Sequence, residues 1–420
     1  MLDIKFIREN AELVKEAARK KRIDFKVEEL LEADAKRLAA LSQVEEMRAK
    51  QNEASAKIAQ AASDVDRQAI IADMTELKAA LQAKEEELKP VMKEWQRLML
   101  AVPNVPDMSV PEGEDDSQNQ EVKAWGERRK FDFVPKSHVE LMQKLHLADF
   151  DRGTKAAGFR GYFLKNEAAE LSFAIWQAAL EHFMGKGFSP MIVPSLVRPE
   201  GFLGTGYLPQ GEEDLYKTQD GDFLAGTAEV ATMAYFMDET LDLAALPKKF
   251  VSFSPCFRRE AGSHGKDTKG LIRVHEFYKV EQVVLCQANH EESVRLHEEI
   301  NRNTEEFIEK LAIPYRTVVN CGGDLGLGQV KKYDIELWVP AENKYREISS
   351  ASYFHDFQCR RLNIRYKDAE GKLRFAHSLN ATAIPTPRIL VSIIENYQNA
   401  DGTITVPEVL RKYLGKDLIK

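Results

Sequence analysis

The sequence predicts an α+β protein: an N-terminal antiparallel helical hairpin, interpreted as a coiled coil, precedes a domain with an antiparallel sheet flanked by helices. Residues 27–100 are almost free of Gly and Pro and rich in Ala, Glu, Lys, Leu and Gln, which is typical of long helices. The rest mixes helical periodicity with alternating runs rich in Val, Ile, Phe and Tyr. We therefore expect domains at 1–100 and 128–420, joined by a linker at 101–127.

Length, charge and cysteine usage narrow the class of protein. The chain has 420 residues, 44% of them hydrophobic, which is enough for more than one core. A net charge of −8 argues against a general nucleic-acid coat, although it leaves room for a local basic surface. The four cysteines are widely spaced, so neither a thiolate zinc site nor a disulfide framework is expected. This cysteine usage suits a reducing cytoplasm. No run resembles a signal peptide or a membrane span.

Apolar residues recur in steps of three and four along both halves of the hairpin. The short segment 61–66, AASDVD, is expected to join two antiparallel helices with a coiled-coil seam between them. Pro90 lies inside the second helix and is expected to kink it. The seam residues are Ala40, Val44, Met47, Gln51, Ala54 and Ile58 in the first half and Ile70, Met74, Leu77, Leu81, Leu88, Val91, Trp95 and Leu98 in the second.

An arm of this length cannot bury itself in a globular core, so it either props domains apart or reaches a partner. Basic residues such as Arg48, Lys50 and Lys57 lie along it. Taken alone, such charges are usually the solvated flank of a coiled coil. The basic run at residues 19–22, RKKR, is interpreted as a solvated helix end rather than a nucleic-acid patch, because cations favour a helix C-terminus.

After the arm the composition changes. Prolines and an acidic run at 101–127 indicate a linker. The elements expected beyond it are helices at about 135–147, 166–186 and 291–312, a strand at 187–197 whose Pro194 suits a sheet edge, a loop-rich stretch at 202–223, a strand hairpin at 330–354, and a helix with a short tail after Arg388.

The stretch 257–282, FRREAGSHGKDTKGLIRVHEFYKVEQ, is predicted to be a strand, a long loop and a second strand. A guanidinium matches two phosphate oxygens, an aromatic ring offers a plane to a base, and a carboxylate binds an ammonium or hydroxyl group. A solvated hairpin laced with ion pairs is the alternative, but the whole set favours a site. Period two places Arg258 and Glu260 on one face of the first strand, and Arg273, His275, Phe277, Lys279 and Glu281 on one face of the second.

This stretch resembles motif 2 of class II aminoacyl-tRNA synthetases, in the form found in bacterial-type seryl-tRNA synthetases. LAGTAEVA, which contains Glu229, resembles the serine-binding loop of that family, and REISSASYFHDFQCRR resembles its late EISS segment. Residues 377–398, HSLNATAIPTPRILVSIIENYQ, resemble motif 3, whose arginine is Arg388 here. Residues 187–197 resemble motif 1, the dimer-forming element. The resemblance spans nearly the whole chain, including the arm, and motifs 2 and 3 together are specific.

The resemblance implies a serine–tRNA ligase that forms seryl-adenylate from L-serine and ATP and transfers serine to the 3′ end of tRNA(Ser), with selenocysteine tRNA left open as a second substrate. It implies a cytoplasmic homodimer whose arm grips tRNA through Arg48, Lys50 and Lys57. The alternatives are an amino acid ligase acting on a carrier protein and a non-catalytic tRNA-binding paralogue. The first would lack the arm, and the second is expected to have lost the motif arginines.

The resemblance also implies roles for individual residues. Arg258 and Arg388 are the catalytic pair, with Arg258 on the α-phosphate and the substrate carboxylate and Arg388 on the γ-phosphate. Glu347 and Ser350 match the family's metal-binding pair and imply Mg²⁺, although an ion pair of Glu347 with Arg346 or a lysine is the alternative. The implied ATP-binding residues are Arg258, Arg259, Glu260, Arg273, Val274, Phe277, Glu347, Ile348, Ser349, Ser350 and Arg388.

The implied serine pocket has one partner for the ammonium group and one for the hydroxyl group. Thr227 and Glu229 are expected on the ammonium side, and Glu281 and Thr382 on the hydroxyl side. Such a site rejects alanine, because its buried polar groups would go unpaired. The full implied set is Thr227, Ala228, Glu229, Glu281, Asn380 and Thr382.

Three positions depart from the family pattern. Gly226 stands where many members have Pro, and Tyr353 stands where an Asn often follows the Ser-x-Ser sequence. Ala381 replaces a glycine, so the loop expected there cannot need positive φ without strain. The departures bear on details of the pocket rather than on the class of reaction.

Overall fold

The computed structural model describes residues 1–60, 64–262, 265 and 267–420, and it divides into two compact units. The helical unit holds Leu2–Arg19 and Ile23–Pro103, and the sheet unit holds Met1, Lys20–Arg22 and Asn104–Lys420. No helix among the described residues has both the length and the apolar character needed to cross a membrane.

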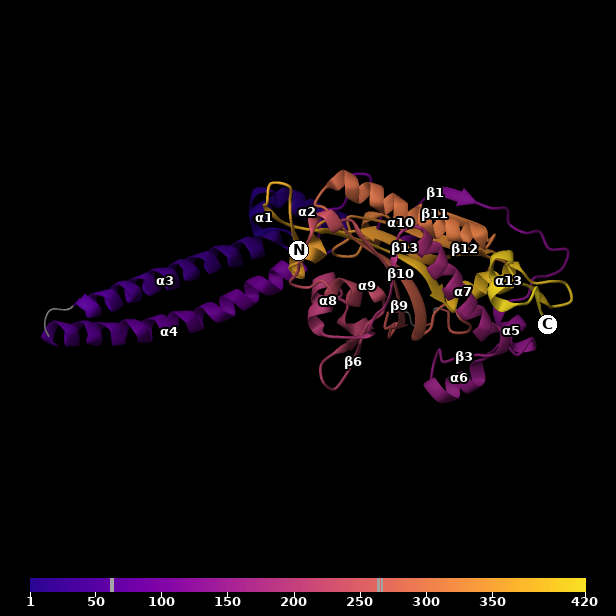
Figure 1. Cartoon of the computed structure of the whole chain (residues 1–420), viewed down its shortest axis with the longest axis horizontal. Helices are drawn as coiled ribbons and strands as arrows, with labels where there is room; N and C mark the ends of the chain where they lie inside the picture. The colour runs from indigo at the N-terminus through magenta and orange to yellow at the C-terminus, as the bar shows by residue number, and fades with distance from the viewer. Residues whose placement is uncertain (61–63, 263–264, 266) are drawn as a thin grey trace. The chain divides into compact units, whose positions relative to one another are not determined.

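The helical unit confirms the predicted hairpin. Its two long helices lie side by side and antiparallel (Figure 1). Val44 and Leu81 are buried in the seam, and Arg37 stacks on Trp95 with its guanidinium carbon 4.5 Å from the ring centre. Pro90 lies inside the second helix, and residues 61–63 of the predicted turn lie outside the described residues. The helices are α1 (Ile4–Glu9), α2 (Ala11–Lys20), α3 (Val27–Gln60) and α4 (Asp64–Ala101).

An eight-stranded sheet forms the centre of the sheet unit (Figure 1). Every pairing is antiparallel except the last, in which β4 lies parallel to β9 at the edge. In spatial order the strands are β1 (Gln120–Trp125), β11 (Tyr315–Val319), β12 (Lys331–Val339), β13 (Lys344–Tyr353), β16 (His377–Thr386), β10 (Glu276–Cys286), β9 (Lys248–Phe257) and β4 (Ser189–Ile192).

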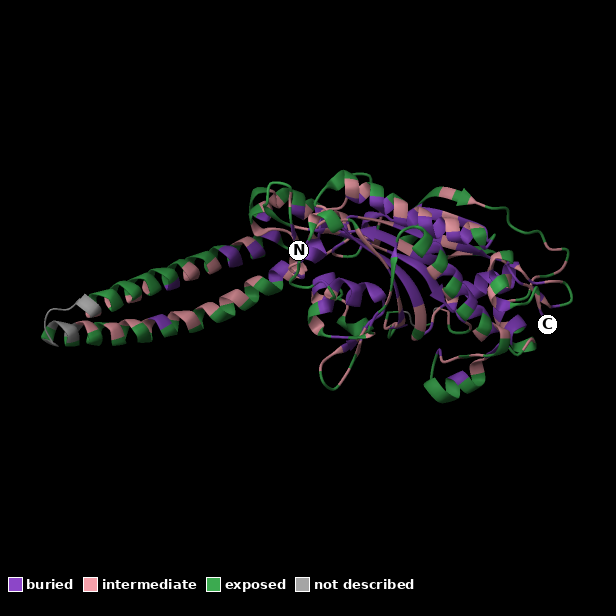
Figure 2. Ribbon diagram, viewed as in Figure 1, coloured by how far each residue is buried: buried purple, intermediate pink, exposed green. Residues whose placement is uncertain are grey.

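Helices α7 (Asn166–Gly185) and α10 (His290–Lys310) pack on the sheet and bury its central strands (Figure 2). Helix α12 (Arg388–Asn396) packs on β12 and β16. The shorter helices are α5 (His138–Lys144), α6 (Phe150–Ala157), α8 (Pro199–Thr205), α9 (Ala228–Ala234), α11 (Phe357–Arg361) and α13 (Glu408–Leu414). The strands of the small sheets are β2 (Ala148–Asp149), β3 (Phe163–Leu164), β5 (Leu196–Val197), β6 (Tyr216–Lys217), β7 (Phe223–Leu224), β8 (Thr240–Leu241), β14 (Arg365–Lys367), β15 (Leu373–Phe375), β17 (Ile404–Thr405) and β18 (Leu418–Ile419).

Several expectations about single segments are corrected. The segment at 101–127, interpreted as a linker, ends in β1, which pairs with β11. The strand expected at 187–197 ends at Ile192, so Pro194 lies beyond it, although β4 is an edge strand as predicted. The stretch 202–223 is loop-rich as expected, and it also contains the end of α8 and β6, which pairs with β7 in a small sheet. The chain after Arg388 forms α12, α13 and a β17–β18 pair rather than one helix and a tail.

The basic run at residues 19–22 ends α2 as expected, and Arg19 and Arg22 are exposed, but Lys21 is not solvated. The side chain of Lys21, within the sheet unit, is buried and donates hydrogen bonds to a loop at residues 326–329.

Candidate active site

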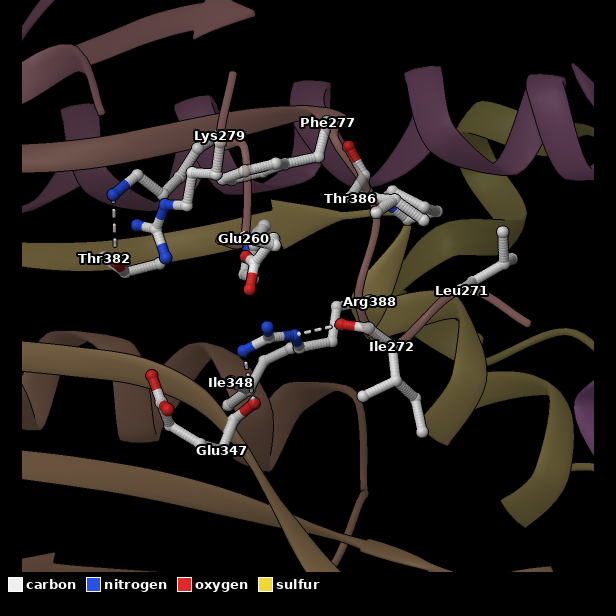
Figure 3. Close-up of a pocket in the computed structure, with 14 residues that line it drawn as sticks. Glu260, Leu271, Ile272, Phe277, Lys279, Glu347, Ile348, Thr382, Thr386 and Arg388 are labelled. Atoms are coloured by element: carbon white, nitrogen blue, oxygen red, sulfur yellow. Dashed lines mark hydrogen bonds between the residues drawn. The ribbon is translucent and has the colours of Figure 1, made fainter. Parts of the chain in front are cut away.

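Two adjoining cavities lie on the face of the sheet opposite α10. Successive residues of β10 reveal the two faces: Gln282 donates through Nε2 to the carbonyl oxygen of Ile300 in α10 (2.9 Å), whereas Glu281 lines a cavity. We call the cavity around Arg258 and Arg388 the arginine cavity (Figure 3). The neighbouring one, of about 370 Å³, contains several acidic side chains and is called the carboxylate cavity. The residues that line both are Arg258, Lys279, Glu347 and Thr382.

Arg258 and Phe277 stack against each other at the entrance to the β9–β10 connection. The guanidinium carbon of Arg258 lies 5.3 Å from the centre of the Phe277 ring, and its Nη2 donates to the carbonyl oxygen of Gly226 (3.4 Å). A Cβ atom at Gly226 would lie 3.1 Å from Cγ of Arg258, so the glycine leaves room for this side chain. A guanidinium held in this way is placed to bind two oxygens of a phosphate or carboxylate.

The prediction that Arg258, Glu260, Arg273 and His275 lie on strands is wrong. β9 ends at Phe257 and β10 begins at Glu276, so all four belong to the connecting loop. Glu260 has a φ of 55°, which an extended strand does not allow. The backbone N–H of Arg258 still donates to the carbonyl oxygen of His275 (2.9 Å), which keeps the two ends of the loop together. The predicted shared face holds for Phe277, Lys279 and Glu281.

Arg388 is the first residue of α12 and is held by two backbone carbonyl groups. Its Nε donates to Ile272 (2.9 Å) and its Nη1 donates to Glu347 (3.1 Å), as Figure 3 shows. Burial lowers the pKa of Arg388, and the charge of the Glu347 carboxylate opposes this change. The two bonds fix the plane of the guanidinium, and Nη2 has no hydrogen-bond partner among the described residues, so it is available to an anion.

Arg273 and Glu260 form an ion pair, with Nη1 of Arg273 2.5 Å from Oε2 of Glu260. Glu260 and Val274 line the arginine cavity, whereas Arg273 and Arg259 line neither cavity. Arg259 donates through Nη1 to the carbonyl oxygen of Glu213 (3.0 Å). Of this predicted group, Glu260 and Val274 therefore line the arginine cavity themselves. Arg273 is linked to the cavity through its ion pair with Glu260.

Glu229 is a buried carboxylate with two neutral donors. Tyr207 donates through Oη to its Oε2 (3.0 Å), and Gln358 donates through Nε2 to its Oε1 (2.7 Å). Ser378 donates to Oε1 of Gln358 (2.7 Å), which sets the orientation of that amide. Burial raises the pKa of Glu229 to about 7, and the bond from Gln358 opposes the increase. Because neither donor is charged, the carboxylate can still take a cationic partner.

Glu281 belongs to a tight polar cluster in the wall between the cavities. Lys279 lies 2.7 Å away, Nζ to Oε2, and Thr382 donates through Oγ1 to the same oxygen (3.2 Å). Asn380 donates through Nδ2 to the other oxygen (3.3 Å). The structure thus brings Glu281, Thr382 and Asn380 together, as expected from the sequence, and adds Lys279.

Two β-bulges bring residues at odd spacing to one wall. On β13 the register shifts between Glu347 and Ser349, which leaves Ile348 as an extra residue. Glu347 and Ser350 are three positions apart and would face opposite sides of a regular strand, but the bulge allows both to line the carboxylate cavity. A second register shift, on the neighbouring strand β16, leaves Ala383 as an extra residue between Thr382 and Ile384.

The carboxylate of Glu347 makes no hydrogen bond or ion pair with any described residue. The alternative pairing with Arg346 does not occur there, because Arg346 pairs with Asp267 and with Glu342 (2.8 Å, Nε to Oε2). A free carboxylate that lines the same cavity as Ser350 fits a hard cation such as Mg²⁺, which takes oxygen ligands and keeps several waters. Among the described residues, no three His, Cys, Asp or Glu side chains are grouped as metal ligands.

Other predicted residues lie behind the cavities rather than in their walls. Thr227 caps α9, accepting from the backbone N–H of Glu229 (3.3 Å), and Thr227 and Ala228 are buried. Ser349 donates to the carbonyl oxygen of Thr382 (2.5 Å), whereas Ile348 lines the arginine cavity.

Two of the departures from the family pattern fall outside the cavities. Ala381 lies in the regular part of β16, opposite Gln282 and Ala351, so the expectation of a loop there is wrong and the residue needs no positive φ. Tyr353 is buried and donates through Oη to Oδ2 of Asp107 (2.8 Å).

Sequence reasoning missed Tyr207, Gln358 and Lys279 as site residues. Lys279 was on the predicted face and its alternation was a usable signal. Tyr207 lies in a Gly-rich stretch and Gln358 in a short helix, and neither position carries a local pattern that points to Glu229.

Comparisons with known proteins agree on one family. The family model for the seryl-tRNA synthetase N-terminal domain matches residues 1–106, and that for the class II tRNA synthetase core domain (G, H, P, S and T) matches residues 216–397. A curated serine–tRNA ligase of Deinococcus radiodurans is 45% identical over 416 residues, covering 99% of this chain and 98% of that protein.

Solved structures agree. Seryl-tRNA synthetase from Pyrococcus horikoshii, complexed with ATP, matches with a TM-score of 0.90 and 40% identity over 100% of this chain and 99% of that one. The cytoplasmic serine–tRNA ligase from Naegleria fowleri, in complex with AMP, matches with a TM-score of 0.87 and 31% identity over the same shares of the two chains.

Proposed function

The chain belongs to the seryl-tRNA synthetase family, and we propose that its two cavities hold the two substrates of serine activation. It activates L-serine with ATP, forming seryl-adenylate and pyrophosphate, and transfers serine to the 3′ end of tRNA(Ser), releasing AMP. We assign ATP to the arginine cavity and serine to the carboxylate cavity.

The observation that carries this assignment is that Arg258 lines both cavities. Activation joins a carboxylate to the α-phosphate of ATP, so the two anions must meet where one fixed cation can contact both. The stack on Phe277 and the bond to Gly226 hold this guanidinium before either substrate arrives. Positioning and fixed positive charge are what such a transition state requires of the protein.

On the ATP side, Arg388 binds the γ-phosphate through the guanidinium edge that Ile272 and Glu347 leave open. Phe277 offers its ring to the adenine, and Glu260 with the Val274 backbone contacts the edge of the base. Arg273 steadies Glu260, and through it the base, by their ion pair. Arg259, bonded to the Glu213 carbonyl group, acts at the rim.

Glu347 and Ser350 would hold Mg²⁺, with phosphate oxygens and water as the remaining ligands. The ion would neutralise charge on the phosphates. Ile348 packs under this wall, and Ser349 ties β13 to β16 behind it.

On the serine side, Glu229 accepts the ammonium group, and Glu281 with Thr382 binds the hydroxyl group. Thr227 and Ala228 position Glu229 at the start of α9, and Asn380 orients Glu281. Alanine has no hydroxyl group to offer Glu281 and Thr382, so the site should discriminate against it.

The arm is proposed to bind tRNA through Arg48, Lys50 and Lys57. All three are exposed, and each pairs with a carboxylate on the arm: Arg48 with Glu85, Lys50 with Glu46 and Lys57 with Glu53, at 2.7–2.8 Å. Exposed pairs of this kind contribute little to stability, so tRNA phosphates can replace the carboxylates at little cost.

We also propose a cytoplasmic homodimer formed through residues 187–194. The edge position of β4 supports this, as does the exposure of Ile192 on β4 (87%) and Phe173 on α7 (66%). All four cysteines are free, which suits a reducing compartment.

ATP–pyrophosphate exchange with each amino acid in turn tests the assignment, followed by charging of tRNA(Ser) and of selenocysteine tRNA. Serine alone should support exchange at a high rate. Exchange with another amino acid, or transfer to a carrier protein instead of tRNA, would favour the carrier-protein ligase. A chain that binds tRNA without exchange would be the non-catalytic paralogue. Neither alternative is favoured, because the arm and both motif arginines are present.

A further inference from the structure

One wall of the carboxylate cavity is a loop whose backbone is held from behind. Residues 326–329, Gly-Leu-Gly-Gln, all line the cavity, and we call them the wall loop. The ammonium group of Lys21 donates to three carbonyl oxygens of this loop, those of Gly326 (3.1 Å), Leu327 (3.0 Å) and Gln329 (2.5 Å). The loop thus turns three of its carbonyl groups toward a single side chain.

Asn104 holds the same loop. Its backbone N–H donates to the carbonyl oxygen of Leu327 (2.9 Å), and its Nδ2 donates to those of Gly328 (3.0 Å) and Phe354 (2.8 Å). Every carbonyl oxygen of the wall loop is therefore bonded to Lys21 or Asn104. Phe354 also lines the carboxylate cavity, so Asn104 ties two parts of its wall together.

Lys21 is 2% exposed, and its ammonium group forms no ion pair with a described residue. Burial lowers its pKa, since no carboxylate offsets the loss of hydration. An apolar side chain would be buried there at lower cost. What the ammonium provides, and an apolar group could not, is three donors that fix the conformation of the loop.

The loop is also tied to the strand that carries the metal-binding pair. Gln329 donates through Nε2 to Oγ of Ser352 on β13 (2.8 Å), and its Oε1 accepts from the backbone N–H of Gly326 (2.6 Å). A shift of the loop would therefore change the wall around Ser352 as well. The loop does not line the arginine cavity.

Lys21 and Asn104 are far apart in sequence, but they belong to the same compact unit as the sheet and flank the helical arm in the chain, one before α3 and one after α4. We propose that Lys21 and Asn104 are positioning residues that fix the wall loop and thereby set the affinity for the amino acid. The inference rests on the assignment of serine to the carboxylate cavity. It makes the two chain segments that flank the arm part of the serine site, although they touch no substrate.

The test is Lys21→Met, which keeps most of the side-chain volume and removes all three donors. Lys26→Met is the matched control, because Lys26 is exposed and, among the described residues, pairs with Glu29 alone (3.3 Å). Pyrophosphate exchange by the full chain is measured while serine and ATP are varied separately. We expect Lys21→Met to raise the KM for serine roughly tenfold, as for loss of a charged hydrogen bond, and to change the KM for ATP and kcat by less than about twofold.

Asn104→Ala should also raise the KM for serine. This variant tests the proposal if Lys21→Met does not fold. A KM for serine that stays within twofold of the unmodified chain, in a variant with unchanged Tm, would overturn the proposal. So would an equal rise in both KM values, since that indicates general loosening of the fold. If the unmodified chain showed no serine-dependent exchange, the assigned function would fail instead, and the two failures are distinguishable.

Discussion

Glu229 should make serine binding depend on pH near neutrality. Its pKa of about 7 lies above its ordinary 4.5, so the stability contributed by its protonated form is full below 4.5 and is lost as pH rises through about 7, about 3 kcal/mol in all. An ammonium group needs the ionised form, so serine affinity measured by calorimetry should increase roughly tenfold from pH 6 to pH 8. Glu229→Gln should bind weakly at every pH. A flat profile for the unmodified chain would contradict the assignment of Glu229.

Arg388→Ala should lower serine-dependent pyrophosphate exchange by roughly 10²–10³-fold, because it removes a fixed charge from the transition state. Arg258→Ala should behave alike. Arg374→Ala is the control, since Arg374 is exposed and its one ion pair within the described part of the chain is with Asp368 (2.9 Å). Far-ultraviolet circular dichroism and Tm identify variants that lose structure instead. Near-normal exchange by a folded Arg388 or Arg258 variant would disprove the role given to that arginine.

At the scale of the element, the arm helix α3 carries the proposed tRNA contacts. Reversal of Arg48, Lys50 and Lys57 to Glu should raise the KM for tRNA and flatten the salt dependence of binding, because phosphate contacts are lost. Serine-dependent exchange should not change. Reversal of Lys367, Lys372 and Arg374, exposed on the β14–β15 hairpin, changes the net charge equally and should leave charging intact. Equal effects of the two sets would indicate a general charge effect rather than a binding surface.

At the scale of the whole molecule, deletion of residues 36–96 with a short glycine bridge should spare serine activation and abolish tRNA charging. The arm has its own seam, and the deletion keeps both Lys21 and Asn104, so the wall loop should stay in place. Exchange and charging are measured on the same preparation. Loss of exchange would show that the arm supports the catalytic fold, and normal charging would make the arm a structural strut.

The dimer is a second prediction at this scale. Light scattering should give twice the chain mass of 47.7 kDa. Ile192→Glu places a charge on the exposed edge strand and should shift the protein toward the monomer, whereas Met108→Glu, at another exposed apolar residue, should not. A monomer at micromolar concentration for the unmodified chain would refute the dimer.

Elements whose signal is local could be predicted from the residues alone. The spacing of apolar residues from Val44 to Leu98 was sufficient to predict the helical hairpin, because the apolar residues of a coiled-coil seam recur every three or four positions. The alternation of Phe277, Lys279 and Glu281 was sufficient for the shared face of β10. The motifs around Arg258 and Arg388 were sufficient to suggest the family, since their chemistry is carried by short contiguous stretches.

The remaining features depend on how distant segments pack together. The bulge at Ile348, which allows Glu347 and Ser350 to line one cavity, depends on the register with the neighbouring strand. The donors to Glu229 come from Tyr207 and Gln358, far apart in the chain, and the burial of Lys21 requires the loop at 326–329. Charges that pattern alone predicts to be solvated can be buried when distant carbonyl groups converge on them. Such convergence is a property of packing between segments, and no local sequence rule encodes it.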